Sequence, residues 1–153
     1  MVGYIIDLRY MTVSLTVDQQ VAVCRYLSDS GFVGDHRMMD NGNWTNQNKS
    51  WYCFADMDDL KWGVEHNDMF TVFLAFGFEP STPRLFSDKT ITDVSYHGDA
   101  GDAMWLWHHI AKALPELDGF IEWAGEGGDR FRWVFKDGVV KEISPRLVWE
   151  NGA

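Results

Sequence analysis

The C-terminal third of the chain has the clearest pattern of hydrophobic and polar positions. Three short runs rich in aromatic and β-branched residues, Phe120–Trp123, Arg130–Phe135 and Val139–Ile143, are separated by Gly-Glu-Gly-Gly and Lys-Asp-Gly. Runs of this kind, joined by glycine-containing turns, are typical of consecutive antiparallel strands. The pattern predicts a C-terminal β-meander.

A second alternating pattern opens the chain and predicts a strand from Tyr4 to Val17, followed by a helix over Gln19–Ser28. One face of the strand would carry Met11, Val13, Leu15 and Val17. Asp18 is the expected N-cap of the helix. Its buried stripe would contain Val21 and Cys24, with Val23 and Leu27 beside them.

The middle of the chain alternates between polar and apolar segments. Phe32–Ser50 is rich in Asn, Gly and Asp and is expected to be a long loop, a kind of segment that is often functional. Trp51–Ala55 resembles a short buried strand. Between Asp58 and Phe76 the spacing predicts two short helices or one broken helix, with Asp56 and the His66–Asp68 segment as capping regions.

The strongest helical pattern follows, over Ala103–Leu114, after strand-like residues at Thr90–Tyr96 and a turn at Gly98–Asp102. Its apolar positions recur with i, i+3, i+4 spacing: Ala103, Leu106, Trp107, Ile110, Ala111 and Leu114. The element order predicts one α+β domain over residues 1–153, with a mostly antiparallel sheet and three or four helices packed on one face. A ferredoxin-like arrangement is a more specific form of this expectation.

Charge is the next informative property, because 23 acidic residues oppose 13 lysines and arginines and give a formal net charge of −10. Such a chain repels phosphate backbones, so the composition predicts no direct binding to nucleic acid. Three interpretations remain: simple solubility, a cation site, or an acidic surface that meets a basic partner. A protein that imitates the charge of DNA belongs to the last class.

Compartment and membrane association follow from a few positions. Cys24 and Cys53 are the only cysteines and are expected to be buried free thiols in a reducing cytoplasm, although one disulfide stays open. Asp7 and Arg9 interrupt the N-terminus too early for a signal peptide. The longest apolar runs are far from membrane-spanning length, so we expect a cytoplasmic protein without membrane contact.

Candidate chemistry is sparse. Asp56, Asp58 and Asp59 follow a hydrophobic run, as the paired aspartates of haloacid-dehalogenase-type phosphotransferases do, but they also suit helix capping. His97, Asp99 and Asp102, with His108 and His109 nearby, do not match a zinc-binding spacing. We therefore expect no cofactor, no metal and no catalytic set, while a dispersed active site stays open.

Two further groups of side chains are candidates for partner binding. Among the eight Trp residues, Trp44 lies in the Asn-rich loop and Trp105 falls off the helical stripe, and exposed Trp is enriched at binding hot spots. Glu122, Glu126 and Asp129 could form an acidic rim, with cross-strand ion pairs to Arg130 and Arg132 as the alternative.

The segment Gly119–Gly138 carries the pattern W-x-G-E-x-G-x-x-x-R-W-x-F-x-x-G and resembles small uncharacterised proteins of actinobacteria and their phages. The likeness covers the C-terminal half, to which Phe76-Gly77-Phe78 also belongs, and excludes the Asn-rich loop and the N-terminal third. It implies an α+β fold and a phage or mobile-element setting, without catalytic residues.

These observations favour a non-enzymatic inhibitor that occupies a basic, nucleic-acid-binding surface of a host protein, as an anti-CRISPR or other anti-defence protein does. Its expected contact residues are Trp44, Asp56, Asp58, Asp59, Glu122, Glu126 and Asp129. The first alternative is a protein that sequesters a nucleotide signal in a Trp-lined pocket, which would need arginines such as Arg9, Arg130, Arg132 or Arg146 to converge. The second alternative is an enzyme with an unrecognised site.

Overall fold

The computed structural model describes residues 4–29, 56–81 and 89–145. Within these ranges the helices are α1 (Val17–Asp29), α3 (Met57–Glu65), α4 (Met69–Ala75) and α5 (Ala100–Ala113). The strands are β1 (Ile5–Met11), β2 (Glu79–Pro80), β3 (Val94–Ser95), β4 (His97–Asp99), β5 (Gly119–Gly125), β6 (Arg130–Lys136) and β7 (Val139–Ile143). The predicted α+β class is confirmed.

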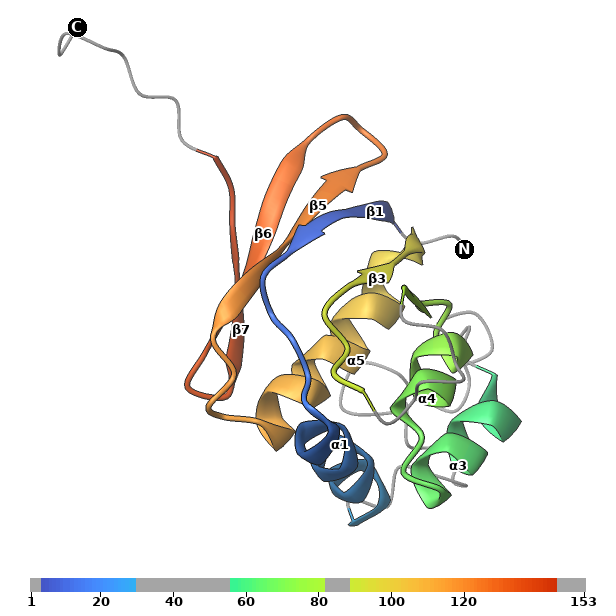
Figure 1. Ribbon diagram of the computed structural model, residues 1–153. Helices are drawn as coiled ribbons and strands as arrows, with labels where there is room; N and C mark the ends of the chain where they lie inside the picture. The colour runs from blue at the N-terminus through green and yellow to red at the C-terminus, as the bar shows by residue number, and fades with distance from the viewer. Residues whose placement is uncertain (1–3, 30–55, 82–88, 146–153) are drawn as a thin grey trace, which may run out of the picture.

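The main sheet has five antiparallel strands in the order β4-β1-β5-β6-β7, and β2 and β3 form a separate two-stranded ribbon. Figure 1 shows the helices gathered on one side of the main sheet. β5, β6 and β7 pair consecutively and form the predicted meander. Asp137 and Gly138 both have positive φ at the β6–β7 turn, which is why an Asp-Gly pair suits this position. The ferredoxin-like arrangement stays a prediction, because residues 30–55 and 82–88 lie outside the described ranges.

The first strand is shorter than its alternating pattern predicts. It ends at Met11, and the chain continues through an isolated bridge between Leu15 and Ile91. Helix α1 begins at Val17 because Thr16 and Gln19 form a reciprocal capping box, in which each backbone N–H donates to the other side chain. Asp18 is therefore in the first turn of the helix and not its cap. Val17 begins the helix and so does not continue the strand face of Met11, Val13 and Leu15; its side chain is exposed.

Helices α3 and α4 are the two short helices that the spacing predicts. Asp56 caps α3 by accepting from the Asp59 N–H, and Asp68 caps α4 by accepting from the Thr71 N–H. The chain turns between them at Asn67, which has a φ of 55°. A Cβ atom at Gly63 would stand 3.0 Å from the Asp68 carbonyl oxygen and from Val72. Glycine at this position lets the two helices pack closely.

Helix α5 carries the predicted buried stripe, and every one of its six predicted apolar positions is buried. It starts at Ala100, earlier than expected, because the Asp99 carboxylate accepts from the Gly101 and Asp102 N–H groups. The residues before α5 were expected to form only the turn Gly98–Asp102. They form β4, which pairs with β1 through Ile5–Asp99 and Asp7–His97.

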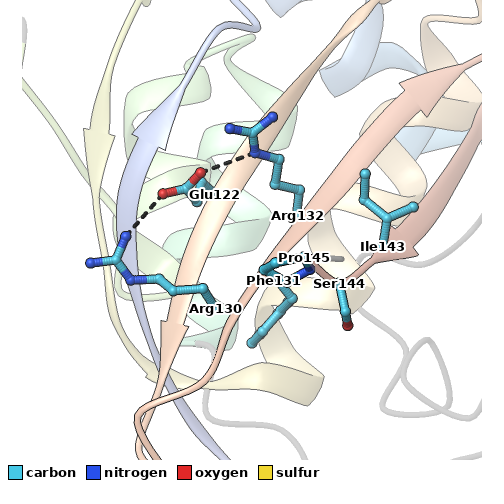
Figure 2. Close-up of a pocket in the computed structure, with 7 residues that line it drawn as sticks. All are labelled: Glu122, Arg130, Phe131, Arg132, Ile143, Ser144 and Pro145. Carbon is cyan, nitrogen blue, oxygen red and sulfur yellow. Dashed lines mark hydrogen bonds and ion pairs between the residues drawn. The ribbon is translucent and has the colours of Figure 1, made fainter. Parts of the chain in front are cut away.

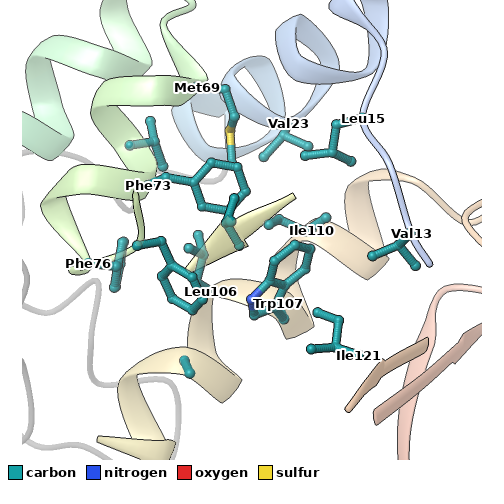
Figure 3. Close-up of a cluster of buried hydrophobic side chains, with 14 of the residues drawn as sticks. Val13, Leu15, Val23, Met69, Phe73, Phe76, Leu106, Trp107, Ile110 and Ile121 are labelled. Atoms are coloured by element: carbon teal, nitrogen blue, oxygen red, sulfur yellow. The ribbon is translucent and has the colours of Figure 1, made fainter. Parts of the chain in front are cut away.

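The core lies between the sheet and the helices and is rich in aromatic rings (Figure 3). The Trp107 ring of α5 lies 5.6 Å from Phe73 of α4 and 5.6 Å from Phe135 of β6, so it connects the two layers. Trp123 and Trp133 pack at 4.6 Å on the covered face of the sheet. Truncating a buried aromatic side chain of this size to Ala typically costs about 3–5 kcal/mol.

Candidate functional site

The acidic residues at the start of α3 are exposed and close together in sequence. Asp56, Asp58 and Asp59 all lie at the surface, and Asp56 accepts from the Asp59 backbone at 3.1 Å. One turn further, Trp62 is 44% exposed and its ring stacks on His66 at 4.1 Å. The start of α3 therefore presents negative charge next to an exposed indole. Trp44, which was predicted to take part, lies outside the described residues.

Glu122 lies on the opposite side of the sheet from the helices, between two arginines of the neighbouring strand. Its carboxylate accepts from Arg130 Nη1 at 3.1 Å and from Arg132 Nε at 3.0 Å (Figure 2). The Arg132 guanidinium also lies 4.1 Å from the centre of the Phe120 ring. The cross-strand ion pairs are thus formed, and each guanidinium keeps N–H groups that Glu122 does not use.

Glu126 and Asp129 hold the N-terminal end of β1. The Ile5 N–H donates to the Glu126 carboxylate at 3.1 Å, and the Glu126 N–H donates to the Ile5 carbonyl at 3.0 Å. The Tyr4 hydroxyl donates to Asp129, and this hydrogen bond raises the pKa of Tyr4. The two carboxylates stay exposed at the β5–β6 turn but are engaged within the chain.

The face of the main sheet that the helices leave uncovered is defined here as the open sheet face. Strand alternation and pairing place on it His97 of β4, Asp7, Arg9 and Tyr10 of β1, Phe120, Glu122 and Ala124 of β5, Arg130, Arg132, Val134 and Lys136 of β6, and Val139, Lys141 and Ile143 of β7. Tyr10 is 57% exposed and its ring lies 5.9 Å from Phe120. Arg9 reaches this face from a bulge in β1, where its Nη1 lies 3.6 Å from the Asp7 carboxylate.

A hollow of about 350 Å³ opens on this face beside the two arginines. Figure 2 shows its lining residues, which are Glu122, Arg130, Phe131, Arg132, Ile143, Ser144 and Pro145. Its volume lies within the range of small-ligand sites, which is about 300–1,000 Å³. A second hollow of about 360 Å³ lies beside β4 and includes Tyr96, His97 and Asp102.

Charge is divided unevenly between the open sheet face and the rest of the described residues. The open sheet face holds five lysines and arginines against two acids, Asp7 and Glu122, and both acids are ion-paired with those arginines. Elsewhere the described residues include seventeen aspartates and glutamates but only four bases, Arg25, Lys61, Lys89 and Lys112. Five of these acids belong to strands and turns of the main sheet: Asp99, Glu126, Asp129, Asp137 and Glu142. The net charge of −10 therefore conceals a locally basic sheet face.

Tryptophan exposure differs from the expectation at one position. Trp105 is only 4% exposed and stacks on Phe76 at 5.3 Å, so the prediction that it lies off the buried surface is wrong. The Phe76 ring, at the C-cap of α4, contributes to this burial, and the one-stripe pattern of α5 did not include it. Among the described tryptophans only Trp62 is largely exposed, and none lines the two hollows.

The histidines and the described cysteine have distinct surroundings. Burial, together with His108 and Lys112, lowers the pKa of His109 to about 4. Burial raises the pKa of the free Cys24 thiol to about 12, which makes it a poor nucleophile at neutral pH. Within residues 4–29, 56–81 and 89–145, no three His, Cys, Asp or Glu side chains are arranged to hold a metal ion. Cys53 lies outside these ranges.

Comparison with known proteins adds no family to this picture, because no family model, curated protein or solved structure matches the chain. Each helix in the described part is too short or too polar to cross a bilayer.

Proposed function

We propose that this chain is a non-enzymatic binding protein that presents acidic residues to a basic surface of another protein. The observation that carries the proposal is the charge division, with seventeen acids against four bases outside the open sheet face. Opposite charge across an interface speeds association and selects the partner. The start of α3 is the favoured contact, because Asp58 and Asp59 are exposed there beside Trp62, a residue type common at hot spots.

The proposed partner is a host protein whose basic surface binds nucleic acid, met in the cytoplasm. The resemblance of Gly119–Gly138 to proteins of actinobacteria and their phages supports a mobile-element setting. In that setting the exposed acids outside the open sheet face, defined here as the acidic side, would compete with nucleic acid for a groove of a defence complex, such as a CRISPR effector. Glu126 and Asp129 add exposed carboxylates to the acidic side, whereas Glu122 is occupied by Arg130 and Arg132.

Affinity capture with charge-reversal variants tests the proposal. The purified chain is used to capture proteins from actinobacterial host lysate at low and physiological salt, and the captured protein is assayed for nucleic-acid binding with and without the chain. Asp58→Lys/Asp59→Lys should abolish capture. Asp18→Lys/Asp29→Lys, which makes the same change of charge on exposed positions of α1, should keep it.

Two outcomes would count against the proposal. One is capture of no protein at either salt concentration. The other is a partner whose nucleic-acid binding is unaffected by the chain. Equal loss with both double variants would show that net charge, and not the start of α3, governs binding.

The small-ligand alternative receives support from one observation, the convergence of Arg130 and Arg132 on Glu122 beside the hollow of about 350 Å³. The residues lining it favour a small anion over a ligand held in a Trp cage. A thermal-shift screen with cyclic and linear nucleotides tests this alternative, because a ligand that binds only the folded state raises the unfolding temperature.

A further inference from the structure

The open sheet face has a charge opposite to that of the whole molecule. Arg9, Arg130, Arg132, Lys136 and Lys141 project from it, and its two acids are already paired. At physiological salt, exposed charges more than about 8 Å apart are largely screened from each other. The acidic residues of the helices are separated from this face by the sheet and the core, whereas Asp129 and Asp137 lie in the turns at the two ends of β6. An anion that approaches the middle of the open sheet face therefore meets mainly its local positive charge.

Aromatic rings accompany these basic residues on β1 and β5, two of the three inner strands. Tyr10 exposes more than half of its surface and lies beside Phe120, whose ring is covered by the Arg132 guanidinium. Unpaired bases stack on such rings and on guanidinium planes, and they do so with little dependence on sequence. A base pair inside a duplex cannot stack on a flat sheet in this way.

The basic positions extend well beyond the hollow. Arg130 and Lys136 lie at opposite ends of β6, and a strand rises about 3.3 Å per residue, so the two positions are about 20 Å apart. Lys141 of β7 pairs with Val134, which lies between Arg132 and Lys136 on the same face of β6. A single nucleotide would meet only one end of this track, whereas an extended chain of phosphates would follow all of it.

We infer that the open sheet face binds single-stranded nucleic acid. Bases stack on Tyr10 and the exposed part of Phe120, while phosphates meet Arg130, Arg132, Lys136 and Lys141. Glu122 acts as a positioning residue, because it holds both guanidiniums in place and leaves their remaining N–H groups for phosphate oxygens. This site is separate from the acidic contact surface proposed above.

Fluorescence anisotropy with a labelled oligothymidylate of about 12 nucleotides tests the inference, at about 50 and 200 mM salt. Arg130→Glu/Arg132→Glu should weaken binding at least about tenfold, and Tyr10→Ala should weaken it about fivefold to tenfold. Each lost phosphate contact should reduce the slope of log K against log salt by about 0.7. The matched control Arg25→Glu/Lys61→Glu changes the net charge equally on the helical side and should alter affinity less than about twofold.

Reversal of both arginines beside Glu122 could disturb folding, so Arg130→Gln/Arg132→Gln serves as a second variant, and circular dichroism confirms that each variant is folded. No binding of the native chain at the lower salt overturns the inference. So does an equal loss in the Arg25/Lys61 control, or binding of a mononucleotide or a duplex as tight as that of the single strand. Asp58→Lys/Asp59→Lys should leave strand binding intact, which separates this test from that of the acidic surface.

Discussion

At the scale of single residues, the chain places its least tolerant positions where two elements approach closely or where a polar group is buried. Gly63 of α3 faces the start of α4, and His109 lies on the core side of α5, 6.0 Å from the Tyr26 ring of α1. Neither position is part of a proposed binding surface. Each nevertheless gives a measurable test of the packing that supports those surfaces.

Replacing Gly63 by Ala should destabilise the fold by about 1–3 kcal/mol, because the new methyl group would press on Val72 and on the Asp68 carbonyl oxygen at 3.0 Å. Urea denaturation measures the change. Gly127→Ala, in the exposed β5–β6 turn, is the control and should cost clearly less, because its Cβ would lie 3.3 Å from the Tyr4 hydroxyl at the end of a flexible side chain. Equal effects of the two substitutions would mean that α3 and α4 do not pack as closely as described.

Stability should fall as the solution is acidified from about pH 7 to about pH 5, in part through His109. Its pKa is about 4 in the folded chain, where burial is the main cause, and about 6.5 in the unfolded chain. The unfolded state therefore binds the proton first, and the stability contributed by neutral His109 is complete above about pH 6.5 and lost toward pH 4. At pH 5 the loss is on the order of 2 kcal/mol.

The measurement is urea unfolding of the native chain and of His109→Gln at both pH values. The variant removes this titration and keeps the carboxylates, so its stability should depend less on pH. Parallel pH profiles for the two proteins would assign the acid sensitivity to other groups.

At the scale of elements, helix ends define the geometry of the acidic side. Asp56 fixes where α3 starts, and so where Asp58 and Asp59 project. The same capping logic starts α1 at Thr16 and α5 at Asp99. A carboxylate at a helix start also interacts favourably with the helix dipole.

Asp56→Ala should cost about 1 kcal/mol of stability, because it removes the acceptor of the Asp59 N–H. Asp58 lies two residues later, in the first turn of α3, and no capping hydrogen bond from its side chain is present among the described residues. Asp58→Ala removes the same charge and should cost clearly less stability. Thermal unfolding of both variants in parallel checks the difference. Similar losses would indicate that charge at the helix start matters more than the capping hydrogen bond.

Several of the observed helices and strands could be predicted from sequence patterns, and others could not. The meander, the two short helices and the buried stripe of α5 follow from local alternation, helical spacing and capping residues, and all were predictable. β4 was not, because His97-Gly98-Asp99 is too short to alternate and becomes a strand only by pairing with β1. The prediction for Trp105 is wrong because its ring stacks on Phe76, a contact outside α5 that no periodicity within the helix can reveal.

Of the candidate contact residues, the exposed carboxylates at the start of α3 could be anticipated from their capping pattern. The grouping of Arg9, Arg130, Arg132, Lys136 and Lys141 on one face could not, because it depends on strand order. Strand alternation within the predicted β6 does place Arg130, Arg132 and Lys136 on one face, so this part of the basic group could be predicted. The net charge of −10 for the whole chain directed the interpretation to the acidic residues instead.

At the scale of the whole molecule, the acidic side carries a self-repulsion that the basic face does not relieve. Raising salt from about 20 to about 300 mM should therefore increase the unfolding temperature, because screening weakens repulsion among the acids. Glu65→Lys, which reverses an exposed acid in the last turn of α3, should stabilise the chain at low salt and reduce this dependence. A salt-independent unfolding temperature would mean that the exposed acids are too far apart to repel one another.

The position of β1 has a consequence for synthesis on the ribosome. This first strand lies inside the sheet, with β4 and β5 as its neighbours, and its register joins Ile5 to Asp99 and Met11 to Ile121. At about 5–20 residues per second, those partners emerge roughly 5–20 seconds after β1. Until then β1 is an unpaired apolar strand exposed to chaperones and to other nascent chains. The main sheet can close only after β5, β6 and β7, which ends at Ile143, have emerged.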